Sequence, residues 1–360
     1  MSRVLLYGSY GFVGRLAARE ALERGIDVTL AGRDREKVKN QSDELGCRAK
    51  RFDLEGPAVV SRALEDVDCV LNCAGPFSNT AEPIVDGCLQ SGTDYVDITG
   101  EIPVIERIAD RDDAAENAGV TLLPAAGFSA VPMDCLGAHL HDRLPEAQNL
   151  ALGVDSFRVP SVGSIVTVIE GIEDGGAVVR DGDLEDVPAA WRTREVDFGR
   201  GPRPATTMPM GDVPTAHYTT DVPNVEVYAF VPQPARFALE SHRYLAPVLA
   251  TPPVRLTLKG LAQLFSLVRE GPSERARDRG SAYLWAEART EGERVVSRLR
   301  TPDPYEVTVD AAVTATERVL AGDAADGYQT PAGAFGPEFV FDLEGVDGFL
   351  DEPAPTAVLE

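Results

Sequence analysis

The sequence contains little lysine. Of its 34 Lys and Arg residues only four are lysines, which leaves 30 arginines. The lysines are Lys37, Lys39, Lys50 and Lys259, and the residues four positions before them are Arg33, Arg35, Gly46 and Arg255. Short-chain dehydrogenases use a Tyr-x-x-x-Lys pair, in which the ammonium group lowers the pKa of the tyrosine. The sequence lacks that pair, which excludes the usual short-chain dehydrogenase mechanism.

Paired cysteines and long apolar runs are also missing. The five cysteines are odd in number and form no C-x-x-C pair, which argues against a zinc site and against a disulfide framework. No apolar run approaches the roughly 20 residues of a membrane-spanning helix, and Val4–Tyr7 is too short for the core of a signal peptide. We therefore expect no metal, no membrane segment and a cytoplasmic location.

Negative charge is in excess. The 58 Asp and Glu residues against 34 Lys and Arg give a net charge of −24, or one unbalanced charge per 15 residues (360/24). Such a chain repels nucleic acids and anionic membranes, so neither is expected as a partner. Many carboxylates with little lysine indicate a halophilic cell with molar salt, which screens the repulsion among them. A GC-rich genome would favour arginine over lysine but would not explain the excess of acids.

Apolar stretches alternate with helical patterns along the first 145 residues. The expected strands are Val4–Tyr7, Asp27–Ala31, Arg48–Leu54, Cys69–Cys73, Tyr95–Ile98 and Val120–Leu123. The expected helices are Phe12–Arg24, Arg35–Leu45, Ala58–Glu65, Thr80–Gln90, Pro103–Asn117 and Val131–Leu144. This alternation is typical of a doubly wound parallel sheet covered on both faces. The predicted fold class is α/β.

The pattern changes after this region. The expected elements are a strand at Asn149–Arg158, a helix at Ser164–Ile172, an amphipathic segment at Leu256–Val268, a hairpin of Ala282–Arg289 and Arg294–Arg300, and a helix at Tyr305–Leu320. The proline-rich stretch 187–234 shows no clean period, and the acidic end, 342–360, is expected to fray. A second domain of mixed α and β structure follows from these elements.

Three glycines mark the junction of the first strand and the first helix. The stretch reads Gly8-Ser9-Tyr10-Gly11-Phe12-Val13-Gly14. In dinucleotide-binding loops the first glycine allows a tight turn, the second lets backbone approach a pyrophosphate, and the third lets helix and strand pack closely. The spacing is one residue longer than the usual G-x-G-x-x-G. A tight turn without a ligand is the alternative, but the strand–loop–helix context favours a cofactor.

Arg33 indicates the kind of dinucleotide. In NAD-binding proteins the second strand ends with an acid that binds the ribose 2′-hydroxyl. Here it ends with Gly32 and Arg33, whose guanidinium group can bind the 2′-phosphate of NADP, with a possible contact from the Ser9 hydroxyl. Asp34 is an alternative ribose ligand, although it also suits the N-cap of the next helix. The predicted cofactor is NADP, with NAD as the alternative.

Other candidate residues follow later strands, at the sheet edge that binds ligands in open α/β folds. Asp53 can accept a hydrogen bond from adenine or cap a helix. The candidates for the ribose and nicotinamide are Cys73, Ala74, Gly75 and Pro76, and those on the substrate side are Phe77, Thr99, Gly100, Glu101, Phe128 and Ser129. The Gly-Pro pair can equally end a strand, and Thr99 and Ser129 can cap helices. No residue is identified as the catalytic acid or base.

These motifs resemble those of the saccharopine dehydrogenase-like oxidoreductases. The similar stretches in the first half are G-S-Y-G-F-V-G at 8–14, L-A-G-R at 30–33, N-C-A-G-P-F at 72–77, Y-V-D-I-T-G-E at 95–101 and G-F-S-A-V-P-M-D at 127–134. The second half is similar to the branch named trans-acting enoyl reductases at 271–273, 298–302 with Tyr305, 318–322, 330–332, 335–337 and 339–340. Ser129-Ala130 departs from the Asp-Ser that is usual in the family.

The resemblance implies a division of the chain and an activity. It implies a Rossmann domain that binds NADP at 1–147, an α+β substrate and dimerisation domain at 148–302, a helical segment at 303–341 that returns to the first domain, and an acidic tail at 342–360. It further implies hydride transfer to the C=C bond of a carrier-bound or lipid-like acyl chain. One alternative is a saccharopine or amino-acid (imine) dehydrogenase, with Arg158, Arg236 or Arg243 binding substrate carboxylates. Another is a sensor or scaffold that binds NADP(H) without turnover.

Overall fold

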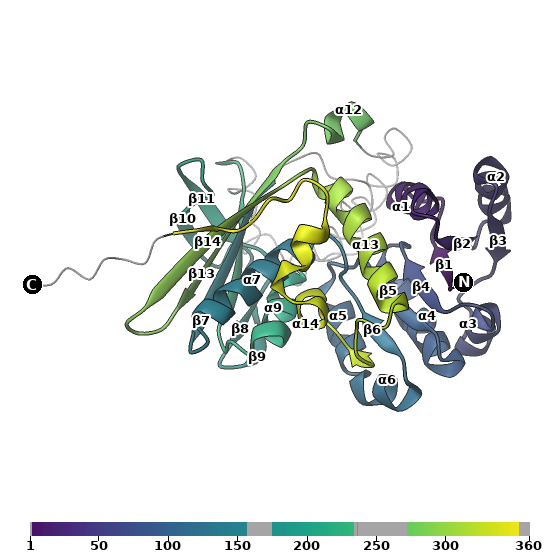
Figure 1. The fold of residues 1–360 in the computed structure, drawn as a ribbon. Coiled ribbons are helices and arrows are strands. Elements are labelled where there is room, and N and C mark those ends of the chain that lie inside the picture. The colour runs from purple at the N-terminus through teal and green to yellow at the C-terminus, as the bar shows by residue number, and fades with distance from the viewer. Residues whose placement is uncertain (1, 157–174, 234–235, 237–271, 353–360) are drawn as a thin grey trace, which may run out of the picture.

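The structure, a computed structural model, describes residues 2–156, 175–233, 236 and 272–352. Within these ranges seven strands form a parallel sheet near the N-terminus and nine form a mixed sheet at the opposite end of the molecule (Figure 1). The predicted elements Ser164–Ile172 and Leu256–Val268 lie outside the described residues.

The parallel sheet has the strand order of a Rossmann fold. Its strands are β1 (Arg3–Tyr7), β2 (Asp27–Gly32), β3 (Arg48–Arg51), β4 (Cys69–Asn72), β5 (Asp94–Asp97), β6 (Thr121–Leu123) and β15 (Gly327–Tyr328). They run in the order β15-β6-β5-β4-β1-β2-β3, and every neighbouring pair is parallel. β2 and β3 are added on one side of β1, whereas β4, β5 and β6 are added on the other side. This change of side between β1 and β4 creates a crevice at the carboxyl ends of these two strands. The predicted fold class is confirmed.

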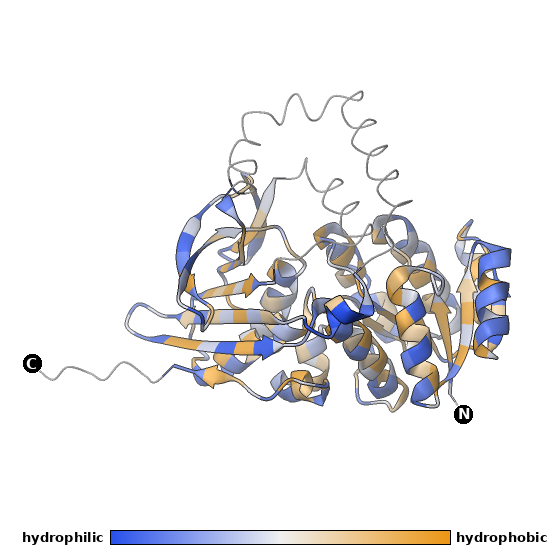
Figure 2. Ribbon diagram, turned by 90° about the horizontal axis from the view of Figure 1, so that it is seen from above, coloured by the Kyte–Doolittle hydropathy of each residue, from blue (hydrophilic) through white to orange (hydrophobic). Residues whose placement is uncertain are grey.

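Helices cover both faces of this sheet. They are α1 (Phe12–Glu23), α2 (Arg35–Leu45), α3 (Pro57–Leu64), α4 (Phe77–Ser91), α5 (Ile102–Ala109) and α6 (Asp112–Ala118), and α7 (Val131–Arg143) follows β6. Their hydrophobic residues face the sheet and their hydrophilic residues face outward (Figure 2). The bounds of α2 match the prediction because Asp34 caps its first turn and Gly46 ends it in a left-handed conformation. The single helix expected at Pro103–Asn117 is instead two, α5 and α6.

The second sheet combines parallel and antiparallel pairs. Its strands are β7 (Asn149–Asp155), β8 (Gly176–Arg180), β9 (Asp183–Val187), β10 (Thr193–Asp197), β11 (Pro202–Thr207), β12 (Val225–Phe230), β13 (Ala282–Arg289), β14 (Arg294–Thr301) and β16 (Leu350–Asp351). The helices α9 (Asp212–Thr220) and α12 (Glu274–Arg277) belong to the same part of the chain. β13 and β14 form the predicted hairpin. β7 and β13 pack on α7, which joins the two sheets.

The stretch 187–234 is more regular than its sequence indicates. It contains β10, β11, α9 and β12. Pro202 and Pro204 lie in β11, and Pro214 lies in the first turns of α9. Proline is tolerated at such positions, but it obscures the period of the apolar residues. The missing period in this stretch therefore does not mean that regular structure is missing.

The C-terminal part of the chain returns to the parallel sheet. Helix α13 (Pro304–Leu320) packs against α1, β4 and β5, and β15 pairs with β6. The Arg24 guanidinium of α1 forms ion pairs with Asp310 at 2.6 Å and Glu317 at 3.0 Å, both on α13. Helix α14 (Pro331–Phe335) and the 3-10 helix Pro337–Asp342 pack against α7. The last third of the chain thus completes both domains.

Residues 342–352 of the acidic end pack against the rest of the molecule. β16 pairs with β14, and the Asp351 carboxylate lies 2.9 Å from the His139 ring and 2.7 Å from the Arg143 guanidinium. Glu352 pairs with Arg298. The expectation that the chain frays from residue 342 was wrong for residues 342–352, because ion pairs to α7 and β14 hold them.

Within the described ranges, no helix is both long enough and apolar enough to cross a membrane.

Salt is expected to stabilise this protein because its net charge is −24. Electrostatic repulsion is screened over about 10 Å at 0.1 M salt and about 3 Å at 1 M. Raising KCl to 2 M should therefore raise Tm by roughly 5 °C, which corresponds to one to two kcal/mol. The measurement is a thermal melt at pH 7.5 across a KCl series. The same series near pH 4, where carboxylates are half protonated, should show a smaller rise; an equal rise at both pH values would contradict the electrostatic cause.

Candidate functional site

The loop between β1 and α1 has a geometry that requires its glycines. Gly8 has φ +79°, and a Cβ there would lie 2.8 Å from Ala74. The Gly11 N–H donates to the Gly8 carbonyl at 3.0 Å, which closes the turn. A Cβ on Gly14 would lie 2.3 Å from the Gly8 oxygen, so α1 approaches the loop as closely as backbone allows. The first N–H groups of α1 therefore point out of the sheet edge at the switch point, where they can bind an anion.

Ser9, the predicted second contact of the 2′-phosphate, is a buried residue of this loop. Its side chain is fully buried, and its Oγ atom has no hydrogen-bond partner within the described residues. The Ser9 carbonyl accepts a hydrogen bond from Gln41 Nε2 at 2.9 Å, and its N–H donates to the Ala31 carbonyl at 3.2 Å. Ser9 therefore fixes the loop through its backbone, and the contact of its hydroxyl with a 2′-phosphate stays a prediction.

The three side chains of the loop that follow Ser9 pack in different directions. The Tyr10 ring lies over Gly32, where a Cβ would come 2.5 Å from Cε1, and its hydroxyl accepts a hydrogen bond from the Asp34 N–H at 3.3 Å. The Phe12 ring meets Tyr305 of α13 edge to face, with 5.2 Å between centroids. Val13 packs against the main hydrophobic core. Tyr10 alone of these three borders the end of β2.

A basic segment follows β2 in this acidic chain. Residues 33–51 contain seven Lys and Arg against four Asp and Glu, a net charge of 7 − 4 = +3. Arg33 is exposed at the start of this segment, and its carbonyl accepts a hydrogen bond from Arg51 Nε at 3.2 Å. The Asp34 carboxylate accepts hydrogen bonds from the N–H groups of Glu36 and Lys37, both at 3.1 Å. Asp34 is therefore the N-cap of α2, and the exposed Arg33 before it stays the predicted ligand of a phosphate.

Asp53 lies beside the same segment. It forms an ion pair with Arg51. Burial raises the pKa of the nearby Tyr7 hydroxyl to about 12, and the charges of Tyr10 and Asp53 add to this shift. Asp53 thus sits close to the end of β1.

The loop after β4 is held from two sides beneath Gly8. The Ala74 N–H donates to Asn72 Oδ1 at 3.0 Å, and the Ala74 carbonyl accepts from Thr80 Oγ1 at 2.6 Å. Gly75 is exposed. The Cys73 thiol is buried, and burial with the nearby Asp97 charge raises its pKa to about 12. Cys73 therefore stays a neutral thiol.

Glu101 caps a helix. Its carboxylate accepts hydrogen bonds from the N–H groups of Phe77 at 2.9 Å and Ser78 at 2.8 Å, the first residues of α4 after Pro76. Both oxygens are thereby engaged with the N-terminus of α4, where a negative charge is stabilised. The arrangement joins the loop after β5 to the loop after β4.

Replacing Glu101 with alanine is expected to lower the free energy of unfolding by roughly 0.5–2 kcal/mol, because two N–H groups at the start of α4 lose their acceptor. Urea unfolding measures the change, and the exposed Glu55 provides the control. A Glu101→Ala protein with unchanged stability and a raised KM would instead place Glu101 on the substrate.

A buried polar chain runs beneath these loops. Asn72 Nδ2 donates to the Tyr95 hydroxyl at 3.1 Å, which donates to Asp97 Oδ2 at 2.7 Å. Asp97 Oδ1 accepts from the N–H groups of Thr99 and Ala125, both at 2.9 Å. Burial raises the pKa of Asp97 to about 6. Sequence reasoning missed this chain, although the polar residues that end β4 and β5, Asn72 and Asp97, are its signal.

The loops after β5 and β6 meet at small residues. The Ser129 hydroxyl donates to the Thr99 carbonyl at 3.2 Å, and a Cβ on Gly100 would lie 3.1 Å from the Ser129 Cβ. Thr99 is buried, and its Oγ1 accepts from the Glu101 N–H at 3.1 Å. The Phe128 side chain belongs to the main core, so it offers no open surface to a substrate. Gly100 and Ser129 remain as candidates for that surface.

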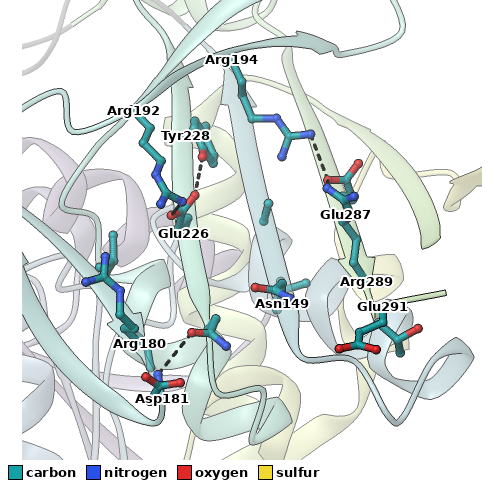
Figure 3. Close-up of a pocket in the computed structure, with 16 residues that line it drawn as sticks. Asn149, Arg180, Asp181, Arg192, Arg194, Glu226, Tyr228, Glu287, Arg289 and Glu291 are labelled. Carbon is teal, nitrogen blue, oxygen red and sulfur yellow. Dashed lines mark hydrogen bonds and ion pairs between the residues drawn. The ribbon is translucent and has the colours of Figure 1, made fainter. Parts of the chain in front are cut away.

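A cavity of about 690 Å³ lies on the second sheet (Figure 3). Its charged lining residues are Arg180, Arg192, Arg194 and Arg289 with Asp181, Glu226, Glu287 and Glu291. Arg194 and Glu287 pair across it at 2.9 Å, and Tyr228 donates a hydrogen bond to Glu226. None of the predicted site residues lines this cavity.

The carboxyl edge of the parallel sheet fits a dinucleotide with a 2′-phosphate. A Cβ at Gly8 would meet Ala74 and a Cβ at Gly14 would meet the Gly8 oxygen, so glycines keep the loop and the start of α1 this close, and the exposed Arg33 follows β2. The described residues contain no group of three or more metal-binding side chains. The structure brings together the predicted residues of the first loop, Arg33, Asp53 and the loop after β4.

Comparison with known proteins agrees with this geometry. Residues 4–123 match the family model of the saccharopine dehydrogenase NADP binding domain. A trans-acting enoyl reductase of Mycobacterium ulcerans is 29% identical over 224 residues, which cover 58% of this chain and 54% of that protein. A probable mitochondrial saccharopine dehydrogenase-like oxidoreductase of Arabidopsis thaliana is 32% identical over 149 residues, 36% of this chain and 33% of that protein. The chain thus spans about half the length, or less, of the curated relatives it matches.

The whole chain also resembles a solved structure. The apo saccharopine dehydrogenase (L-Glu forming) of Saccharomyces cerevisiae superposes with a TM-score of 0.67 over 98% of this chain and 100% of that chain, at 14% identity. At that identity the likeness concerns the fold. Residues 4–123 are therefore similar to the saccharopine dehydrogenase NADP binding domains, and the chain as a whole has the saccharopine dehydrogenase fold.

Proposed function

We propose that this protein is an NADP-dependent reductase that acts on the C=C bond of a carrier-bound or lipid-like enoyl substrate. In this proposal Gly8, Gly11 and Gly14 bind the pyrophosphate and Arg33 binds the 2′-phosphate. Asp53 contacts the adenine, and the stretch from Cys73 to Pro76 borders the ribose and nicotinamide.

The basic segment is the observation that carries the cofactor assignment. A net charge of +3 over residues 33–51 contrasts with −24 for the chain, and it follows directly on the strand end where NAD-binding proteins have an acid. With Asp34 engaged as an N-cap, Arg33 is left to bind a phosphate. A guanidinium group suits that role because it forms two parallel hydrogen bonds to phosphate oxygens.

The relatives support the substrate. The Mycobacterium proteins matched at 29–30% identity are named trans-acting enoyl reductases, and their similarity covers 46–58% of this chain. NADPH would supply the hydride for such a reduction. The chain's own residues hold the loop after β4 in place, where it would border the cofactor: Asn72 and Thr80 fix Ala74, and Glu101 fixes the start of α4. Rigid positioning of this kind contributes to catalysis because less order is lost at the moment of reaction.

Two measurements test the proposal in 2 M KCl. Thermal melts with NADPH and NADH should show a larger rise in Tm with NADPH. Oxidation of NADPH is then followed with enoyl thioesters and with saccharopine-type imines, and enoyl turnover is expected. Turnover of the imines alone would favour an amino-acid dehydrogenase. Binding of NADPH without turnover of either enoyl thioesters or imines would favour a sensor. Light scattering tests the homodimer that we also propose to form through the second domain.

A further inference from the structure

Asp212 is a buried carboxyl group without a partner. It is the first residue of α9, it is fully buried, and neither of its carboxylate oxygens has a hydrogen-bond partner in the described part of the chain. Burial raises the pKa of this carboxyl well above its usual range, and the charge of Asp134 on α7 adds to the shift. A buried polar group without a partner destabilises a fold, so a folding role does not account for it.

Asp134 shows what a structural aspartate looks like in the same region. It is equally buried, but Oδ1 accepts from Thr219 Oγ1 at 2.6 Å and Oδ2 accepts from the Ala332 N–H at 2.7 Å. These bonds tie α7 to α9 and α14. Asp212 lies on the same helix as Thr219, but among the described residues its carboxylate forms no such hydrogen bond to another element.

The position of Asp212 links it to the candidate substrate loops. A Cβ on the preceding residue, Gly211, would lie 3.2 Å from the Gly100 Cα and 2.8 Å from Ile105 Cδ1. Gly100 in turn packs against Ser129. The start of α9 therefore lies against the loops that follow β5 and β6, at the edge where ligands bind in such sheets.

The helical period gives the direction of the side chain. Thr219 faces Asp134, and Asp212 precedes Thr219 by seven residues, almost two turns. Asp212 thus lies on the face of α9 that is directed toward α7, whose first residue follows the Ser129-Ala130 loop. Among the described residues, Asp134 is the charged group that acts on Asp212 from the helices packed against α9.

We propose that Asp212 is the proton donor of the reduction, a neutral carboxylic acid that faces the substrate side of the nicotinamide. This inference rests on the proposed function. NADPH is oxidised to NADP+ as its hydride adds to the β-carbon of the enoyl group and the C=C π bond breaks. The Asp212 proton passes to the α-carbon, and water reprotonates the carboxylate.

A proton-release measurement tests this without a known substrate. NADP+ carries a positive nicotinamide ring and NADPH does not, so only NADP+ should lower the pKa of a carboxyl that faces the ring. With a pH indicator in weak buffer from pH 6 to 10, binding of NADP+ should release more protons than binding of NADPH. The difference should vanish in Asp212→Asn and persist in Asp94→Asn, a half-buried aspartate at the other end of β5 whose pKa burial also raises.

Turnover provides the second readout. With crotonyl-CoA as probe, Asp212→Asn should lower kcat by about 100-fold or more while the Kd for NADPH changes less than about threefold. An equal proton release for both cofactors in the wild type, or an unchanged difference in a folded Asp212→Asn protein, would overturn the proposal. If neither cofactor binds the wild type, the proposed function itself fails, which is a distinct result.

Discussion

Replacing Gly14 with alanine is expected to abolish tight NADPH binding. The new Cβ would lie 2.3 Å from the Gly8 carbonyl oxygen, a backbone atom that cannot move aside alone. Helix α1 must therefore shift away from the loop, and its first N–H groups move from the phosphate position. We expect the Kd for NADPH to rise by more than about 100-fold, or roughly 2.7 kcal/mol. Overpacking should also lower the free energy of unfolding by about 1–3 kcal/mol.

Titration calorimetry with NADPH measures this effect, and urea unfolding measures the stability. Gly292→Ala is the matched control, because a Cβ at Gly292 meets nothing within 4 Å. The control should bind NADPH like the wild type. Wild-type affinity in a folded Gly14→Ala protein would contradict a cofactor at this loop.

Replacing Arg33 with alanine is expected to remove the preference for NADPH over NADH. A charge-assisted hydrogen bond to the 2′-phosphate contributes about 1.5–3 kcal/mol, so the Kd for NADPH should rise roughly 10- to 100-fold. The Kd for NADH should stay within about threefold, because NADH lacks the 2′-phosphate that Arg33 is proposed to bind. Arg33 is exposed, so we expect little change in stability.

Arg19→Ala is the control for the loss of one positive charge. Arg19 lies on α1, is exposed and pairs with Glu44. This control separates a local contact from a general change in the field of the acidic chain. Equal weakening of NADPH binding by both substitutions would show that only net charge matters. Unchanged NADPH affinity in Arg33→Ala would assign the phosphate to another basic residue of the segment 33–51.

The first half of the fold could be predicted from local signals. Helix α2 has both a side-chain N-cap and a glycine C-cap, so its bounds followed from the sequence. The turn at Gly8, Gly11 and Gly14 could also be predicted, because each of these glycines is required for a separate steric reason at the end of β1. By contrast, β11 carries two prolines, and its place in the sheet depends on pairing with β10 and β12, which no local pattern reveals.

Side-chain roles were harder to predict than backbone position. Ser9 and Glu101 both lie where a ligand contact seemed natural, but Ser9 is buried and Glu101 caps α4. Asp212 was not recognised at all, because its importance depends on burial and on the approach of Gly211 to Gly100. Contacts between residues more than 100 positions apart are set by the tertiary fold, and a single sequence does not display them.

The return of the chain to the parallel sheet has a consequence for biosynthesis. Strand β15 and helix α13 come from residues 304–328, yet they complete a sheet whose first strand begins at residue 3. A ribosome therefore releases most of the polypeptide before the cofactor domain can close. Until then the flank of α1 and the edge of β6 are uncovered, and chaperones have a defined apolar surface to recognise. Nascent chains arrested before residue 304 should bind such chaperones and fail to retain NADPH.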